Sequence, residues 1–341
     1  MKIIKTVDAV GHVLCHDITQ IIKDVTKDVR FHKGHIVTKE DIPVLLSLGK
    51  DHLYVWEKKE GMLHEDEAAE ILREICQSEY TIASEVKEGK IELFAACDGV
   101  LKIDTEILNK INCLDDISIA TRHNNTPVKK GDKLAGMRVI PLVVAEEKVL
   151  MAKQIAGEKN ILNVLPYKKL KVGVVTTGNE VFHGRIEDTF TPVIVNKLKT
   201  YGLAMQEHRL VNDEPKNITK AIQELIDSGM EMIVCTGGMS VDPDDMTPAA
   251  IKATGAEIVT YGVPVLPGAM FLLAYNKGKL PIMGLPGCVM YAKTTIFDLV
   301  LPRVIAGEKI NKLDLMGLGH GGLCLECTVC TYPACSFGKG V

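Results

Sequence analysis

The stretch EMIVCTGGMSVDPDDMTPAAI, residues 231–251, carries the strongest indication of the fold of this chain. It starts with a short apolar run that is typical of a buried strand, and two glycines follow directly. It ends in a helix-forming segment, for which we predict Thr247 as the N-cap and Pro248 in the first turn. A strand, a glycine turn and a helix in this order are typical of an α/β protein.

The same alternation extends on both sides of this stretch. Two further strands are predicted in KVGVVTTG (171–178) and LAMQEHRLV (203–211). Two amphipathic helices are predicted in TPVIVNKLKTYG (191–202) and NITKAIQELIDSG (217–229), each ended by a glycine.

A hairpin and a long helix complete this region. The segment FLLAYNKGKLPIMGLPG (271–287) indicates two strands that turn at Asn276–Gly278, and we expect the helix from Cys288 to about Ile305. The alternation predicts an α/β domain over residues 166–310, a three-layer fold with a mostly parallel sheet covered on both faces.

The rest of the chain is less regular. We predict an N-terminal α+β accessory region over residues 1–60 and a second over 61–165, with a hairpin around Asp98–Gly99. Residues 311–341 form a tail rich in glycine and cysteine.

The composition limits the classes of partner. With 46% hydrophobic and 25% charged residues, the chain has the composition of a globular protein. The formal net charge of −4 gives no strong basic field, so we expect no nucleic-acid partner. No apolar run is long enough to cross a bilayer, and the first residues lack the apolar core of a signal peptide. We therefore expect no membrane partner and a cytoplasmic location.

Three glycine-containing turns each follow a predicted strand. They are TTGNE (176–180), CTGGMS (235–240) and GLPGCV (284–289). Ligands of open α/β sheets bind at the carboxyl ends of the strands, so we expect these turns to gather at one edge. Each turn alone is equally well explained as an ordinary loop.

Carboxylates accompany these turns. Glu180 projects from the first turn, Asp213 follows a strand, and Asp242, Asp244 and Asp245 precede a helix. Acidic residues also cap helices, so each position has a structural explanation. Glycine loops usually favour phosphate, which carboxylates repel, and a magnesium ion between the two would reconcile them.

The ordered set of motifs resembles a known family. TTGNE, ND, TGGMSVDPDDMTPAAI, PGAMFLLA and GLPGC follow the order seen in the molybdopterin-binding domain of molybdenum-cofactor biosynthesis. Across about residues 170–307 the chain is similar to the molybdopterin molybdenumtransferase family. The resemblance implies an enzyme, a transferase that takes adenylylated molybdopterin and molybdate, cleaves the adenylyl bond with Mg²⁺ and leaves molybdenum on the dithiolene. It also implies a homodimer.

The resemblance also implies roles for individual residues. Glu180, Asp213 and Asp245 match the acidic catalytic positions, and Asp245 is the leading ligand for Mg²⁺. The expected molybdopterin-binding residues come from the glycine turns and the strand ends before them: Thr177, Gly178, Thr236, Gly237, Gly238, Ser240, Gly268, Pro286 and Gly287.

The sequence also departs from the family pattern. The usual SGGVSVG is TGGMSVD here, and Cys288 and Val289 replace the asparagine and proline of LPGNP. The family's MDG loop and C-terminal barrel domain are absent from the sequence. The DDMTP ending is closer to molybdopterin adenylyltransferases. Two alternatives to molybdenum insertion therefore stay open: adenylyl transfer, and a non-enzymatic protein that carries or senses the cofactor.

The tail contains a separate candidate site. In CLECTVCTYPAC (324–335), Cys324, Cys327, Cys330 and Cys335 have two, two and four residues between them. Four thiolates at such spacing can hold an iron–sulfur cluster or Zn²⁺, and the spacing is near that of the bacterial ferredoxin run. Disulfides and a flexible tail with free thiols are the alternatives.

Overall fold

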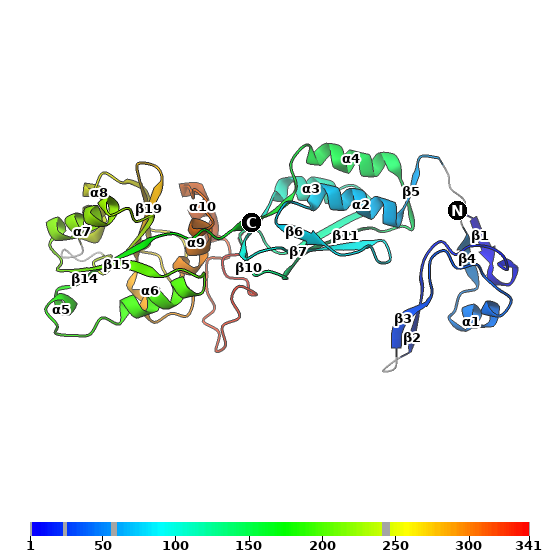
Figure 1. Cartoon of the computed structure of the whole chain (residues 1–341), viewed down its shortest axis with the longest axis horizontal. Coiled ribbons are helices and arrows are strands. Elements are labelled where there is room, and N and C mark those ends of the chain that lie inside the picture. The colour runs from blue at the N-terminus through cyan, green and yellow to red at the C-terminus, as the bar shows by residue number, and fades with distance from the viewer. Residues whose placement is uncertain (1, 23–25, 56–59, 241–245, 341) are drawn as a thin grey trace. The chain divides into compact units, whose positions relative to one another are not determined.

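The computed structural model describes residues 2–22, 26–55, 60–240 and 246–340 (Figure 1). Its contacts divide the chain into two compact units. Unit 1 comprises residues 1–96, 103–122 and 131–163, and unit 2 comprises residues 97–102, 123–130 and 164–341. The division into four parts that the sequence suggests is a finer one and stays a prediction.

The first part of unit 1 is built from short strand pairs. Strand β1 (Lys2–Lys5) pairs antiparallel with β4 (His52–Val55), and β2 (Ile18–Ile22) pairs antiparallel with β3 (Thr26–Phe31). Helix α1 (Asp41–Ser47) contributes Leu45 to a small core with Leu14, Ile18 and Leu53.

The second part of unit 1 is a sheet covered by helices. Its strand order is β6 (Thr81–Ala83), β7 (Lys90–Ala95), β11 (Lys133–Val139) and β9 (Ile117–Thr121), and β5 (Met62–His64) pairs separately with β12 (Val143–Ala145). Helices α2 (Glu65–Cys76), α3 (Thr105–Asn112) and α4 (Glu146–Ala156) lie on one side of this sheet (Figure 1).

The predicted hairpin around Asp98–Gly99 is wrong. Strand β8 (Gly99–Ile103) does not pair with β7; it lies between β10 (Pro127–Val128) and β13 (Leu162–Pro166) in a separate sheet. A Cβ atom at Gly99 would collide with the carbonyl oxygen of Leu165. The glycine therefore allows two strands to approach closely, rather than marking a turn.

Unit 2 is organised around a six-stranded sheet. Its order is β15 (Met205–Val211), β14 (Val172–Thr177), β16 (Met232–Thr236), β19 (Leu280–Leu285), β18 (Leu272–Asn276) and β17 (Glu257–Tyr261). The first four strands are parallel, whereas β18 pairs antiparallel with both β19 and β17. The mostly parallel α/β sheet and the hairpin of β18 and β19 are thus confirmed.

Alternate residues of the same strands feed two separate cores. On one face, Val174 and Val234 pack with α6 (Phe190–Lys199) and α9 (Ile296–Ile305). On the other, Val175 and Ile233 pack with α7 (Pro215–Asp227) and α8 (Thr247–Ala253). Figure 1 shows α7 and α8 on the opposite side of the sheet from α6. A strand that is buried on both faces has apolar residues at successive positions. This is why these strands could be predicted from the sequence.

Two helix starts differ from the prediction. Residues 287–290 form a 3₁₀ turn, η2 (Gly287–Met290), and α9 begins only at Ile296, because Thr295 and Asp298 form a capping box there. Helix α8 has Met246 at its N-cap, with Thr247 as its first residue. The Thr247 hydroxyl donates instead to the carbonyl oxygen of Gly237, 2.8 Å away.

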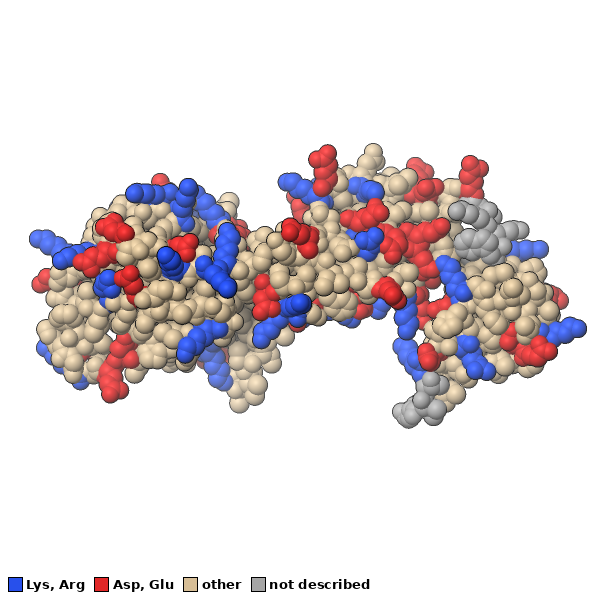
Figure 2. All heavy atoms as spheres, in the orientation of Figure 1, with Lys and Arg blue, Asp and Glu red and all other residues tan. Residues whose placement is uncertain are grey.

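The C-terminal segment packs on unit 2. Helix α10 (Lys312–Met316) is followed by a short 3₁₀ turn and a loop that forms a bridge between Leu323 and Leu266. Phe337 is 2% exposed and belongs to the core that contains α9. Within the described ranges no helix is both long and apolar enough to cross a membrane. Acidic and basic side chains alternate over the visible face of unit 2 (Figure 2).

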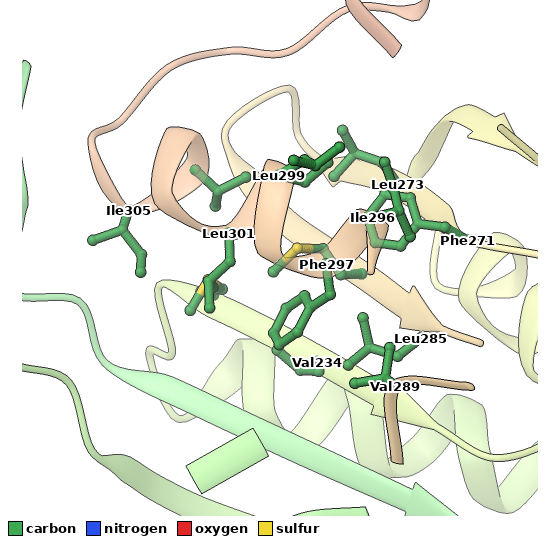
Figure 3. Packing of buried hydrophobic residues seen from close by; sticks show 14 of the residues in the cluster. Val234, Phe271, Leu273, Leu285, Val289, Ile296, Phe297, Leu299, Leu301 and Ile305 are labelled. Carbon is green, nitrogen blue, oxygen red and sulfur yellow. The ribbon is translucent and has the colours of Figure 1, made fainter. Parts of the chain in front are cut away.

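The core of unit 2 generates a stability prediction. Phe297 of α9 is fully buried and lies against Val234, with Leu285 and Val289 close by (Figure 3). Replacing Phe297 by alanine should lower the free energy of unfolding by about 3–5 kcal/mol, because the mutation leaves a cavity between helix and sheet. Urea denaturation followed by circular dichroism measures this change.

The matched control is Leu313→Ala, since Leu313 is 82% exposed. That variant should unfold within about 0.5 kcal/mol of the unmodified protein. Equal destabilisation by the two substitutions would contradict the packing described for α9.

Candidate functional site

Four loops meet at one edge of the sheet in unit 2. Strands β14, β15, β16 and β19 are parallel neighbours and end at Thr177, Val211, Thr236 and Leu285. The loops that follow therefore leave the sheet on the same side. This confirms the expectation that the three glycine turns gather at one edge.

The turn after β16 is held tightly against β14. Gly237 and Gly238 have φ values of +83° and +56°, in the region that favours glycine. A Cβ atom on Gly237 would collide with the carbonyl oxygen of Thr177. The Thr247 hydroxyl donates to Gly237 O, and its N–H donates to Gly238 O at 3.1 Å. The turn is thus fixed in shape by β14 and by the first residue of α8.

Thr236 presents an unmatched polar group at the base of this turn. Its side chain is fully buried, and its hydroxyl has no hydrogen-bond partner among the described residues. A buried hydroxyl without a partner costs free energy, so such a group is expected where a ligand completes the bonding.

The neighbouring threonine on β14 is fully bonded. Thr176 lies beside Thr236 in the parallel register, and its Oγ1 is 2.9 Å from both Thr191 Oγ1 and His208 Nε2. Asp188 accepts the N–H groups of Phe190 and Thr191 at 2.9 and 3.0 Å. Burial lowers the pKa of His208, and the nearby Asp188 opposes that shift only in part. The neutral imidazole is therefore favoured at this edge.

The polar contacts of Thr176 with Thr191 and His208 were not predicted from the sequence. Asp188 has the residue type of a helix cap, and it does stand just before α6. Thr191 lies in a helix and His208 in a strand, and both elements were predicted from their apolar residues. The contacts of these two polar side chains with Thr176 are formed only in the folded structure.

The two described carboxylates of the predicted catalytic set lie on adjacent loops. Glu180 is exposed in the short helix α5 (Asn179–Phe182), and its carboxylate lies near Gly178. Asp213 is half-buried, and its Oδ2 accepts the N–H of Asn179 at 2.8 Å, which ties the loop after β15 to the loop after β14. Asp245, like Asp242 and Asp244, lies outside the described residues.

The remaining predicted molybdopterin-binding positions have different surroundings. At Gly268, φ is +126° and a Cβ would lie 2.5 Å from Ile296 Cγ2, so close packing against α9 already requires glycine there. Pro286 is the N-cap of η2, and a Cβ on Gly287 would meet nothing within 4 Å. The exposed Ser240 is fixed through its carbonyl oxygen, which accepts the Tyr261 hydroxyl at 3.1 Å.

The four tail cysteines form a second candidate site, which is distant in the sequence from the glycine turns. All four have free thiols, and all four line one cavity of about 320 Å³ in unit 2. Within the part of the chain that the structure describes, no three His, Cys, Asp or Glu side chains are placed to hold a single metal ion.

Comparisons with known proteins agree with the motifs of the α/β domain. Residues 173–306 match the family described as probable molybdopterin binding domain, which is the resemblance predicted from the ordered loops. Residues 3–57 match a domain family of unknown function.

Curated relatives match over the same part of the chain. A molybdopterin molybdenumtransferase from Synechococcus elongatus is 26% identical over 132 residues, 36% of this chain and 33% of the relative. A CinA-like protein from Mycobacterium avium is 33% identical over 90 residues, 26% of this chain and 21% of the relative. The chain thus spans a third or less of the length of these two relatives.

Solved structures with a similar region include a molybdopterin biosynthesis enzyme, MoaB, from Thermus thermophilus. It is 20% identical, with a TM-score of 0.32, and the match covers 41% of this chain and 98% of that one. A tungsten cofactor synthesizing MoaB from Pyrococcus furiosus is 22% identical, with a TM-score of 0.31, and the match covers 36% of this chain and 84% of that one.

Thr236 and Thr176 are neighbours on adjacent strands, and together they allow a direct test of whether the Thr236 hydroxyl lacks a hydrogen-bond partner. Thr236→Val removes a buried hydroxyl that lacks a partner, so the free energy of unfolding should rise by about 1 kcal/mol. Thr176→Val should lower it by about 1–3 kcal/mol, because Thr191 and His208 lose a partner. Urea denaturation of both variants measures the two changes. A loss of stability in Thr236→Val as large as that in Thr176→Val would contradict the unmatched state of the Thr236 hydroxyl.

Proposed function

Since residues 173–306 match the probable molybdopterin binding domain family, we propose that the carboxyl edge of the sheet in unit 2 binds molybdopterin or adenylylated molybdopterin. We further propose that the protein is a Mg²⁺-dependent transferase that inserts molybdenum from molybdate. The observation that carries the proposal is the turn at Gly237 and Gly238, fixed against Thr177 and Thr247, with the unpartnered Thr236 hydroxyl at its base.

The turn supports binding of an anionic, phosphorylated ligand. Because the protein itself fixes the turn, its backbone N–H groups are ordered before a ligand arrives, which reduces the entropy lost on binding. Gly237 and Gly238 both adopt a positive φ, and successive backbone N–H groups in turns of this kind can point together at an anion such as phosphate. The Thr236 hydroxyl can donate a further hydrogen bond.

The carboxylates fit a magnesium ion that is completed by the substrate. Protein sites for Mg²⁺ commonly provide one or two carboxylates, while substrate phosphates and water fill the remaining positions. Asp245 is the proposed carboxylate ligand, and Glu180 and Asp213 are the proposed supporting carboxylates. When bound, the ion would reduce the negative charge on the phosphate whose adenylyl bond is cleaved.

Adenylyl transfer is the second candidate. The DDMTP segment at residues 244–248 favours it, since that ending is closer to molybdopterin adenylyltransferases. The cofactor carrier remains the third, favoured by Cys288 and Val289 in place of the asparagine and proline of the family loop. Burial raises the pKa of the Cys288 thiol, so this replacement adds no negative charge to the edge.

Calorimetric titration combined with activity assays distinguishes these candidates. Molybdenum insertion predicts binding of adenylylated molybdopterin and its turnover when molybdate and Mg²⁺ are present. Turnover of molybdopterin with ATP instead would establish the adenylyltransferase, and binding without either reaction would establish the carrier. If neither form of molybdopterin binds, the proposed function is wrong.

The role of Asp245 gives a quantitative prediction. Asp245→Asn should keep the fold and lower turnover of adenylylated molybdopterin roughly 10²- to 10³-fold, because a neutral amide offsets less charge in the transition state. Asp244→Asn, one position away in the sequence, is the matched control and should change turnover far less. Turnover of Asp245→Asn at the rate of the unmodified protein would refute the role of this carboxylate.

A further inference from the structure

The cavity lined by the tail cysteines is not used by the proposed molybdopterin site. Its wall contains Cys324, Cys327, Cys330 and Cys335, together with Lys293 and Phe337. The volume of about 320 Å³ is far larger than the roughly 10–15 Å³ that one water-sized guest requires. All four cysteines of a twelve-residue segment line this one cavity. This arrangement indicates that the cavity binds a ligand through their sulfur atoms.

The tail is held in place by the α/β domain. The N–H of Cys324 donates to Leu266 O at 2.8 Å, and the N–H of Leu266 donates to Gly322 O at 2.8 Å. At the other end of the segment, the Tyr332 hydroxyl donates to Asp298 O at 3.0 Å, and Phe337 is buried in the core. The cavity is therefore part of the folded unit, which argues against a flexible tail with free thiols.

A cluster and a single ion require different arrangements of the four thiols. A tetrahedral Zn²⁺ site places each sulfur about 2.3 Å from the metal, so the sulfurs converge within about 4 Å of one another. No three of these side chains are placed to hold one ion, although all four face the same cavity. A cluster of several iron and sulfide atoms occupies a larger volume and takes its thiolates from the surrounding walls.

The surroundings of Cys330 contain a hydrogen-bonding group for sulfur. Its Sγ lies 3.2 Å from Thr294 Oγ1. Lys293 also lines the cavity, and its Nζ donates to Thr328 O at 2.7 Å. Hydrogen bonds to sulfur and nearby charge are the means by which proteins stabilise and tune bound iron–sulfur clusters.

We propose that this cavity binds a [4Fe–4S] cluster through Cys324, Cys327, Cys330 and Cys335. Each thiol loses its proton on binding and forms one Fe–S bond. The first three cysteines have the spacing of the bacterial ferredoxin run, and one additional residue precedes the fourth. The site is distinct from the proposed molybdopterin site, and its presence does not depend on the reaction at the glycine turns.

The test uses the full chain, purified without oxygen and then supplied with sulfide and with equal amounts of ferrous and ferric iron, the two oxidation states that the cluster contains before reduction. We expect about four iron and four acid-labile sulfide atoms per chain, and a paramagnetic resonance signal after reduction with dithionite. The double variant Cys327→Ala/Cys330→Ala should lose nearly all bound iron and the signal. Both of these side chains are exposed, so the variant should keep the circular dichroism of the unmodified protein.

Cys113→Ala is the matched control, because Cys113 is an exposed free thiol in unit 1. It should retain full iron and sulfide content. The proposal is overturned if the reconstituted protein holds no cluster, if it isolates with one Zn²⁺ that iron does not replace, or if the double variant keeps the iron of the control.

Discussion

The candidate site depends on one close approach between two backbones. Gly237 lies so near the carbonyl oxygen of Thr177 that no side chain fits between them, and Thr247 then bonds to the carbonyl oxygens of Gly237 and Gly238. This contact joins β14, β16 and α8 at the point where the parallel strands end. The other loops are built around it, since Asn179 directly follows the β14 turn and binds Asp213 of the next loop. A larger residue at Gly237 would therefore displace the whole edge.

Most of the α/β domain was predictable because its signals are local. Buried parallel strands appear as uninterrupted apolar runs, and α7 carries an apolar face that ends before Gly229. The start of α9 was predicted too early, because the mostly apolar residues 287–292 were included in the helix, whereas the bonds of Thr295 and Asp298 set the boundary. The hairpin predicted around Gly99 was wrong for a different reason. In the sequence alone, a glycine that permits two strands to pack closely cannot be distinguished from a glycine in a turn.

The site was predictable to the extent that it consists of glycine turns and carboxylates at strand ends. Its polar interior was not, because Thr176, Thr191 and His208 meet only in three dimensions. Two glycines of the predicted binding set have different surroundings. Packing against Ile296 accounts for Gly268, whereas a Cβ atom at Gly287 would meet none of the described residues within 4 Å. Space for a ligand is therefore present beside Gly287 and not beside Gly268.

Hydrogen–deuterium exchange with and without molybdopterin tests the central claim most directly, because it locates binding along the backbone. We predict slower exchange, on adding the ligand, in residues 178–180, 236–240 and 286–288, the three glycine turns at the carboxyl edge of the sheet. Exchange in unit 1 should be unchanged. Protection confined to unit 1, or binding that leaves all three turns at their original rates, would contradict the assignment of the site.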